Sequence, residues 1–259
     1  MYELSLQDMP KISPLFHGTS HTLILSCLQG YMGRAWVNDL VNPVSAQIVV
    51  GDFCFFAGIP DKTLVQNIHI ASPSGFLLII PGSNDWEYLI EHVYSGHFER
   101  FMRYAIKKEP EVFLREQLSG NLKQLPDGYS LHRINQKIYN LLRETEQLRD
   151  LCSVFDSFES YEKYGLGFVI MHEDTIVSGA SSYTVYDKGI EIEVDTLPEY
   201  RRKGLALICS SRLILECLER GLYPSWDAMN KESVSLSAKL GYHLDKEYPT
   251  YFVDPSPGN

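Results

Sequence analysis

The stretch from Glu191 to Glu219, which reads EIEVDTLPEYRRKGLALICSSRLILECLE, decides how the rest of the chain is interpreted. Its first part alternates acidic residues with Ile, Val and Thr, a pattern typical of a strand with one polar and one apolar side. Pro198 cannot continue the hydrogen-bond ladder of a sheet, and the basic turn after it opens a helix. The stretch therefore predicts a strand, a loop and the N-terminus of a helix.

The loop between this strand and this helix has the composition of a phosphate site. A helix N-terminus presents unpaired N–H groups and the positive end of the helix dipole, and both favour an anion. Gly204 allows close approach of the backbone and a positive φ, while the small Ala206 keeps a second approach open. We expect a pyrophosphate to bind here, at Arg201, Arg202, Lys203, Gly204, Leu205 and Ala206.

Other phosphate loops do not fit this stretch, because no Gly-Lys-Ser/Thr and no G-x-G-x-x-G pattern is present at the turn. A solvated helix cap is the alternative interpretation. The spacing of Arg201, Gly204 and Ala206 resembles motif A of the GCN5-related N-acetyltransferase (GNAT) superfamily, in which Gln or Arg and Gly are followed by Gly or Ala. The segment PSWDAMN at 224–230, followed by a helix pattern ending in Gly241 and Tyr242, resembles motif B.

The resemblance covers about residues 129–253 and is greatest to a bacterial group with a long N-terminal segment. It implies an α+β protein whose residues 126–259 form a GNAT domain, with a mixed, mostly antiparallel central sheet flanked by helices. The polar segment 120–128, punctuated by Pro and Gly, predicts the domain boundary. Residues 1–125 show mixed helix and strand patterns and are predicted to form an N-terminal α+β domain, on analogy a degenerate GNAT-like unit.

The resemblance also implies a cofactor, acetyl-coenzyme A (acetyl-CoA). In similar proteins the central strand separates from its neighbour, and its backbone holds the pantetheine arm and the acetyl carbonyl. These roles map to Val194 and Thr196 here. Asn230 and Ser233, at the start of the motif B helix, would flank the pantetheine.

Three acids on the central strand are candidates for the base that deprotonates the acceptor amine. Members of the superfamily often use a carboxylate on this strand, so Glu193 and Glu191 are the predicted catalytic residues, with Asp195 third. Burial and repulsion among three acids on one face would raise at least one pKa towards neutrality. The alternative is that these acids bind a cationic substrate without transferring a proton.

The general acid departs from the pattern of the superfamily. Many members have a tyrosine seven residues after the motif B asparagine, where this chain has Ser237. Either another hydroxyl, such as that of Tyr242 or Tyr251, protonates the leaving thiolate, or the thiolate leaves unaided. The sequence does not decide between these alternatives.

Composition sets limits on partners and location. The formal net charge is −10 and the basic residues cluster only locally, which argues against nucleic acid as a partner. Five cysteines without C-x-x-C spacing predict free thiols in a reducing cytoplasm. The sequence shows no signal-peptide pattern and no apolar stretch of about 20 residues, so neither export nor a membrane span is predicted. His17 and His21 have helical spacing, but Gly18 disrupts the helix, so no metal is predicted.

The sequence therefore predicts a cytoplasmic, acetyl-CoA-dependent N-acetyltransferase that transfers an acetyl group to the amine of a small molecule. One alternative is a non-catalytic acyl-CoA-binding or regulatory module, and another is a protein or peptide N-acetyltransferase. The N-terminal half would cover the acceptor site or help a homodimer form. The acceptor amine cannot be derived from the sequence, because acceptor pockets are built from variable loops.

Overall fold

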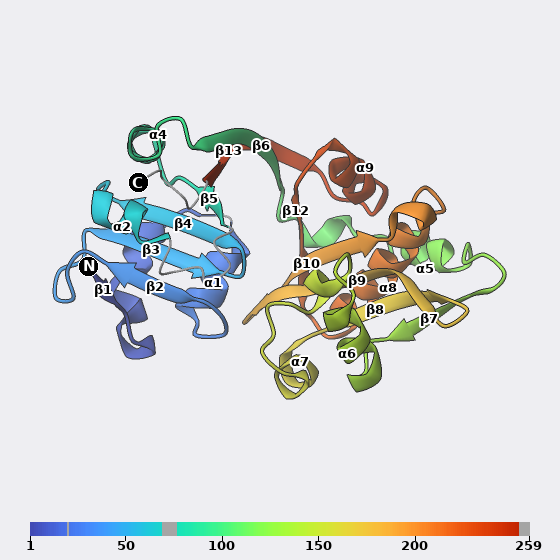
Figure 1. The fold of residues 1–259 in the computed structure, drawn as a ribbon. Helices are drawn as coiled ribbons and strands as arrows, with labels where there is room; N and C mark the ends of the chain where they lie inside the picture. The colour runs from blue at the N-terminus through green and yellow to red at the C-terminus, as the bar shows by residue number, and fades with distance from the viewer. Residues whose placement is uncertain (20, 69–76, 254–259) are drawn as a thin grey trace. The chain divides into compact units, whose positions relative to one another are not determined.

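The computed structural model describes residues 1–19, 21–68 and 77–253, and the chain divides into two compact units (Figure 1). Unit 1 contains Met1–Arg103 and the C-terminal segment from Tyr248, and unit 2 contains Tyr104–Glu247. The units therefore do not follow the predicted boundary after residue 125, because α5 (Arg115–Leu122) packs against α8 (Leu205–Glu219) of unit 2.

Unit 1 is built on a sheet in the order β1-β2-β3-β4-β5, with β13 beside β5 and β6 beside β13. Strands β1 to β4 pair antiparallel, whereas β4 and β5 pair parallel. Its elements are β1 (Tyr2–Glu3), α1 (Thr22–Leu28), β2 (Arg34–Val37), β3 (Ser45–Val50), β4 (Phe53–Gly58), α2 (Lys62–Gln66), β5 (Leu78–Ile80), α4 (Asn84–Val93), and parts of β6 (Phe98–Ile106) and β13 (Leu244–Val253).

Unit 2 is built on a second sheet in the order β7-β8-β9-β10-β11. Strands β7 to β10 pair antiparallel, and β10 and β11 pair parallel. Besides α5 and α8, its elements are β7 (Tyr129–Arg133), α6 (Gln136–Glu144), the 3₁₀ turn η4 (Arg149–Leu151), α7 (Phe158–Tyr164), β8 (Gly167–His172), β9 (Thr175–Tyr186), β10 (Gly189–Thr196), the 3₁₀ turn η5 (Pro198–Tyr200), β11 (Tyr223–Ser225), β12 (Asp227–Ala228) and α9 (Lys231–Lys239).

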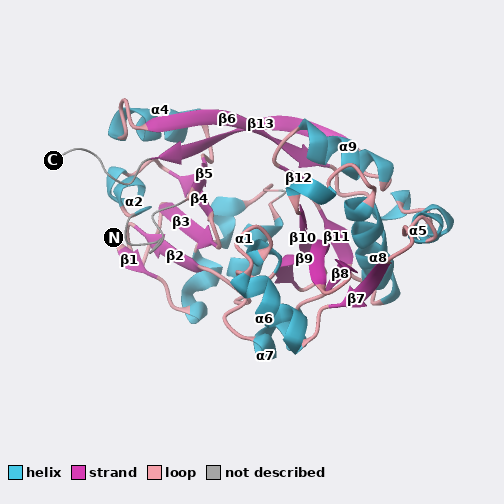
Figure 2. Cartoon of the chain, turned by 45° about the vertical axis from the view of Figure 1, so that its right-hand side comes forward, coloured by secondary structure: helices cyan, strands magenta, loops and turns pink. Residues whose placement is uncertain are grey.

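The helices of unit 2 cover both faces of its sheet (Figures 1 and 2). On one face α8 packs against β8, β9 and β10. On the other face the Tyr161 hydroxyl of α7 lies 2.8 Å from Ser181 Oγ of β9, and Leu151 of η4 lies against Gly179. A Cβ at Gly179 would lie 2.6 Å from Leu151 Cδ1, so glycine at this position lets η4 approach the sheet closely.

The two units repeat one topology. In each, a strand and helical segments precede three strands that complete an antiparallel four-stranded sheet, and a helix then leads to a fifth strand parallel to the fourth. Strands β4 and β5 of unit 1 thus correspond to β10 and β11 of unit 2. This agrees with the expectation that the N-terminal half is a second α+β unit of the same kind.

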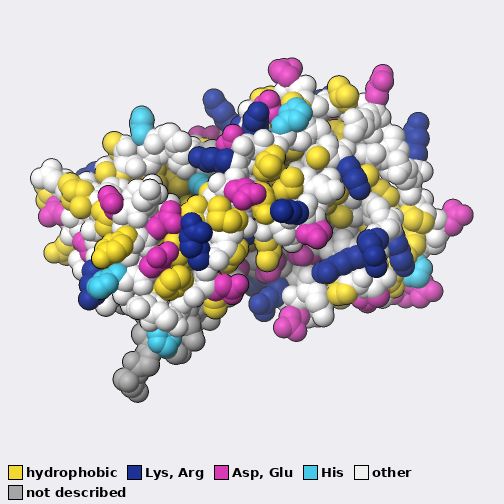
Figure 3. All heavy atoms as spheres, turned by 90° about the horizontal axis from the view of Figure 1, so that it is seen from above, with side chains coloured by type: hydrophobic (Ala, Val, Ile, Leu, Met, Phe, Trp, Pro, Cys, Tyr) yellow, Lys and Arg dark blue, Asp and Glu magenta, His cyan; other side chains and the backbone are white. Residues whose placement is uncertain are grey.

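Lys and Arg side chains lie interspersed with Asp and Glu over the face shown in Figure 3.

Candidate active site

Strand β10 separates from its parallel neighbour halfway along its length. It pairs with β9 from Gly189 to Thr196, but with β11 only from Gly189 to Glu191. Beyond Ser225 the chain passes into β12, which pairs with β6 instead. Among the described strands, none pairs with residues 192–196 of β10 on the β11 side. Backbone groups on this edge are therefore available to a ligand.

The register shows which residues present these groups. The Leu197 N–H donates to the Val177 carbonyl of β9, at 2.9 Å. Hydrogen-bonding direction alternates along an antiparallel pair, so Asp195 and Glu193 direct their backbone groups to β9, and Val194 and Thr196 direct theirs to the open side. The Thr196 carbonyl accepts a hydrogen bond from Arg201 Nε at 3.2 Å. Val194 and Thr196 thus direct their backbone groups to the open edge, where Arg201 already occupies the Thr196 carbonyl.

The loop after β10 has the geometry of an anion site. Arg202 has φ 61° and Gly204 has φ 78°, so two left-handed residues lie within the last three before α8. Such alternation turns successive N–H groups towards one concave surface. Gly204 is the N-cap of the 15-residue helix α8, and no side chain caps its first N–H groups. A Cβ at Gly204 would meet nothing within 4 Å, so the space above the loop is open.

The side chains of this loop differ in exposure. Arg201, Arg202 and Lys203 are exposed, whereas Leu205 is buried and offers only its backbone to a ligand. The exposed cations and the open helix N-terminus together favour a doubly charged anion such as a pyrophosphate.

The motif B side chains are engaged in hydrogen bonds, and Asn230 is the N-cap of helix α9. Asn230 Oδ1 accepts a hydrogen bond from the Ser233 N–H at 2.9 Å, and Ser233 Oγ accepts one from Trp226 Nε1 at 3.1 Å. The amide group of Asn230 retains its two N–H donors, and the side chain is exposed. These hydrogen bonds hold the start of α9, which contacts β12, the short strand that follows β11.

The three predicted acids do not share one environment. Glu193 is the cross-strand partner of Ser181, and Asp195 is the partner of Gly179, so both lie on the face covered by η4 and α7. The register shifts between Glu191 and Ile192, and this irregularity interrupts the alternation. Glu191 is buried, and its charge contributes, after burial itself, to the raised pKa of Tyr223.

The carboxyl of Asp195 has a strongly perturbed pKa. Its pKa is raised to about 6, mainly by burial and then by the charge of Asp150, while the charge of Arg201 opposes both effects. Asp150 reaches this position because Leu151, the next residue, packs on Gly179, the cross-strand partner of Asp195. The repulsion expected among the acids of β10 therefore comes from a residue of η4 instead.

The candidate hydroxyl acids are all engaged elsewhere. Ser237 Oγ donates to the Val234 carbonyl at 2.9 Å within α9. The hydroxyl of Tyr242 donates to the Pro224 carbonyl, and burial raises its pKa. Tyr251 belongs to unit 1, where its hydroxyl donates to Glu91 Oε1 at 2.7 Å.

Buried thiols offer no nucleophile. All five cysteines are buried, and burial raises the pKa of each to about 12, so they remain protonated near neutral pH. The described residues also contain no group of three or more His, Cys, Asp or Glu placed to hold a metal ion. In the described part of the chain, no helix has the length and apolar character needed to cross a membrane.

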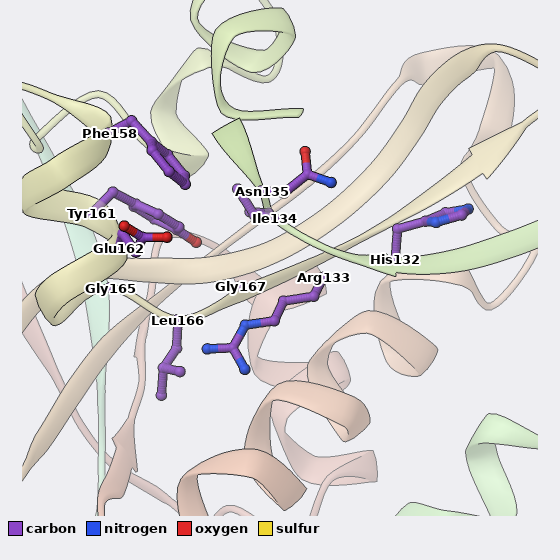
Figure 4. Close-up of a pocket in the computed structure, with 10 residues that line it drawn as sticks. All are labelled: His132, Arg133, Ile134, Asn135, Phe158, Tyr161, Glu162, Gly165, Leu166 and Gly167. Atoms are coloured by element: carbon purple, nitrogen blue, oxygen red, sulfur yellow. The ribbon is translucent and has the colours of Figure 1, made fainter. Parts of the chain in front are cut away.

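A cavity of about 510 Å³ lies where β7 ends and β8 begins (Figure 4). It is at the opposite end of this strand pair from Tyr129 and His172, the residues next to the phosphate loop. The described residues that line it are His132, Arg133, Ile134, Asn135, Phe158, Tyr161, Glu162, Gly165, Leu166 and Gly167. None of them is a predicted site residue.

Comparison with known proteins shows the family of the chain. The family model described as GNAT acetyltransferase matches residues 13–251. The chain belongs to the GNAT acetyltransferase family. A GCN5-related N-acetyltransferase-like protein from Streptococcus suis 89/1591, known from its crystal structure, is 40% identical with a TM-score of 0.89, and the match covers 95% of this chain and 98% of that one. GNAT membership indicates acyltransferase activity.

Two further relatives place the chain more broadly. The uncharacterized N-acetyltransferase YdfB of Bacillus subtilis (strain 168) is 29% identical over 188 residues, which are 67% of this chain and 65% of that protein. The match thus spans less than two thirds of the length of this GNAT relative. A tandem GNAT protein from the clavulanic acid biosynthesis pathway is 11% identical with a TM-score of 0.59, covering 99% of this chain and 98% of that one. At this identity the likeness shows the fold alone, an α+β protein with two mixed sheets.

Sequence reasoning did not find every group near the site. Asp150 was not among the predicted residues, because its approach to Asp195 depends on how η4 packs. Tyr129, His172 and Tyr200, which gather beside the phosphate loop, were also missed. They come from three different elements, and no spacing in the sequence links them.

Proposed function

We propose that this GNAT protein is an acetyl-CoA-dependent N-acetyltransferase that transfers an acetyl group to the amine of a small molecule. The observation that carries the proposal is the open edge of β10 followed directly by the left-handed loop at Arg202 and Gly204. The loop suits the pyrophosphate of coenzyme A, and the backbone of Val194 and Thr196 suits the amides of its pantetheine arm. GNAT proteins typically use this cofactor.

The acetyl carbonyl would lie against the open edge of β10, where a backbone N–H donor stabilises the oxyanion of the tetrahedral intermediate. We take the N–H of Val194 as this donor, because it faces the open side. Thr196 lies two residues closer to the loop on the same edge, and it would bind the pantetheine. Asn230 and Ser233 would line the opposite wall at the start of α9.

The base must accept a proton from an ammonium group near neutral pH. Glu193 and Glu191 are the residues that the sequence predicts, and Asp195 has a pKa of about 6 in the structure, close to the value that suits a general base. We therefore propose that one of these three carboxylates deprotonates the amine, with Asp195 the strongest candidate. Ser237 and Tyr242 donate to backbone carbonyls, so the thiolate of coenzyme A would leave without a protein acid.

The first experiment is a thermal shift with acetyl-CoA, with NAD and ATP as controls. A ligand that binds only the folded state at a hundredfold excess over its Kd stabilises the protein by about 2.7 kcal/mol. We expect a shift with acetyl-CoA and none with the controls. The absence of a shift would mean that the loop is only a helix cap, and the proposal would fail.

Release of coenzyme A during incubation with a panel of small amines then tests catalysis. A non-catalytic acyl-CoA-binding module would bind the cofactor without amine-dependent release. A peptide N-acetyltransferase would release coenzyme A with peptides and not with small amines. The first result would overturn the proposed activity, and the second would replace the proposed class of acceptor.

A further inference from the structure

Three aromatic rings gather beside the phosphate loop. Tyr129 begins β7, His172 ends β8 and Tyr200 ends η5. The centroids of Tyr129 and His172 are 4.5 Å apart, those of His172 and Tyr200 are 5.8 Å apart, and those of Tyr129 and Tyr200 are 6.4 Å apart. All three side chains are half-buried, so part of each ring faces solvent.

Lys203 of the loop contacts two of these three residues. Its Nζ lies 4.6 Å from the centroid of Tyr200 and donates a hydrogen bond to the hydroxyl of Tyr129 at 3.4 Å. The sequence predicts that Lys203 contacts the pyrophosphate, yet in the structure its ammonium group points towards the rings. We call Tyr129, His172, Tyr200 and Lys203 the aromatic cluster.

The chemistry of the aromatic cluster differs from that of the loop itself. The loop offers backbone N–H groups, which suit phosphate oxygens. The cluster offers ring faces, on which a purine stacks, and an ammonium group, which pairs with a phosphate. A ligand that satisfies both neighbouring surfaces carries a pyrophosphate joined to a purine nucleoside with a further phosphate.

A simple cation–π contact does not account for this arrangement. Lys163 lies 4.6 Å from the ring centroid of its neighbour Tyr164 on α7, which is the same distance as in the Lys203–Tyr200 pair. Lys163 and Tyr164 are consecutive residues of one helix, so their contact is local. The aromatic cluster instead brings together elements from β7, β8, η5 and the loop, directly before the left-handed Gly204.

We propose that the aromatic cluster binds the adenosine 3′-phosphate end of acetyl-CoA, with the adenine packed against the aromatic rings and the 3′-phosphate paired with Lys203. This inference rests on the proposed function, because it needs the pyrophosphate in the adjacent loop. It assigns Lys203 to the 3′-phosphate and leaves the pyrophosphate to the loop backbone and Arg202. The pantetheine arm is unaffected by it.

Calorimetry with three ligands tests the assignment: acetyl-CoA, acetyl-dephospho-CoA, which lacks the 3′-phosphate, and acetyl-4′-phosphopantetheine, which lacks the nucleotide. We expect loss of the 3′-phosphate to weaken binding about tenfold, which corresponds to one charge-assisted hydrogen bond. Lys203→Gln should weaken acetyl-CoA about tenfold and leave acetyl-dephospho-CoA unchanged. Tyr200→Ala should weaken both nucleotides about tenfold and leave the phosphopantetheine unchanged.

Lys163→Gln and Tyr164→Ala are the matched controls, because they remove a pair of the same geometry on α7. Neither should change the affinity for any of the three ligands, and melting temperatures check that each variant folds. Equal affinity of the wild-type protein for acetyl-CoA and acetyl-dephospho-CoA would overturn the assignment, as would equal weakening of all three ligands by Lys203→Gln. If none of the ligands binds, the proposed function itself fails.

Discussion

The two units end their fourth strands differently, although they share one topology. In unit 2, the chain after β11 leaves β10, and α8 starts at Gly204 without a side-chain cap. In unit 1, Gly82 lies against the Phe56 carbonyl of β4, so closely that a Cβ there would be 2.2 Å from the oxygen. The region that is open in unit 2 is therefore closed in unit 1.

Further contacts fill the corresponding region of unit 1. Trp86 of α4 stacks on Phe56, with centroids 4.6 Å apart and planes at 15°, and its Nε1 donates to the Gly58 carbonyl at 3.0 Å. The carboxylate of Asp61 accepts from the Thr63 and Leu64 N–H groups at the start of α2. A negative charge thus occupies the helix N-terminus where unit 2 leaves it open to an anion.

This comparison separates what the fold requires from what a cofactor requires. Both units have the antiparallel strands and the parallel fifth strand, so these features serve the core of either unit. Within the residues that the structure describes, only unit 2 combines an open strand edge, a left-handed loop and a helix N-terminus without a side-chain cap. We therefore expect one acetyl-CoA per chain, bound to unit 2.

Trp86→Ala tests whether Trp86 is structural and gives the largest expected effect. The side chain is fully buried in the core of unit 1 with Phe56 and Tyr251. Its removal should cost about 3–5 kcal/mol of unfolding free energy, as for other buried aromatic residues. Urea unfolding measures the loss. Calorimetry should still find one acetyl-CoA per chain, because Asp61 continues to cap α2; a second binding event would break the comparison.

Much of unit 2 was predictable because its signals are local. The alternation before Pro198, the basic turn and the apolar stripe of the following helix identify β10, the loop and α8 from neighbouring residues alone. The sequence did not predict α7, because it has only Tyr161 as a buried anchor and lacks an apolar stripe. Strand β13 continues through Pro249, although proline has no N–H to donate to the sheet.

The site was predictable only where backbone position decides it. Val194 and Thr196 were assigned from the resemblance to GNAT proteins, which maps backbone roles onto this strand, and their roles stay predictions until a ligand is bound. The environment of Asp195 was not predictable, since it depends on Gly179 admitting Leu151 and with it Asp150. The contacts that fill the corresponding region of unit 1 were not predictable either, because Trp86 and Phe56 are distant in sequence.

Gly204→Val should abolish acetyl-CoA binding, which means at least a hundredfold, or about 2.7 kcal/mol, weaker affinity. A β-branched residue resists the φ of 78° and places methyl groups in the open space above the loop. Gly96→Val is the matched control, because Gly96 has φ 80° and open space around it, but lies in unit 1. Unchanged affinity of the Gly204 variant in calorimetry would refute the phosphate-loop assignment.

Asp195→Asn should stabilise the protein by about 2 kcal/mol at pH 8, since one pKa unit corresponds to about 1.4 kcal/mol. The folded carboxyl, with its pKa raised to about 6, binds its proton more tightly than the unfolded chain does. Stability is therefore lost as the pH rises from about 4 through about 6, and the full penalty remains above that. Melting temperatures across this range should show the gain of the variant at pH 8 and little gain at pH 4.

The same variant tests the identity of the base. If Asp195 is the base, activity of the wild-type protein should rise with pH through about 6, and Asp195→Asn should lose this limb together with most of its activity. Glu193→Gln should keep the limb. Loss of the limb in the Glu193 variant and its retention in the Asp195 variant would identify Glu193 instead.

Asp150→Asn should give the smallest effect, a shift of less than about one pH unit. Burial is the larger cause of the raised pKa of Asp195 and remains in the variant, while the repulsion from Asp150 is removed. The acid limb of the pH–rate profile should therefore move to lower pH without loss of the maximal rate. Asp150 is half-exposed, so solvent screens its charge and limits the shift. An unchanged limb would mean that η4 only covers the strand, whereas a loss of maximal rate would mean that Asp150 itself contacts the amine.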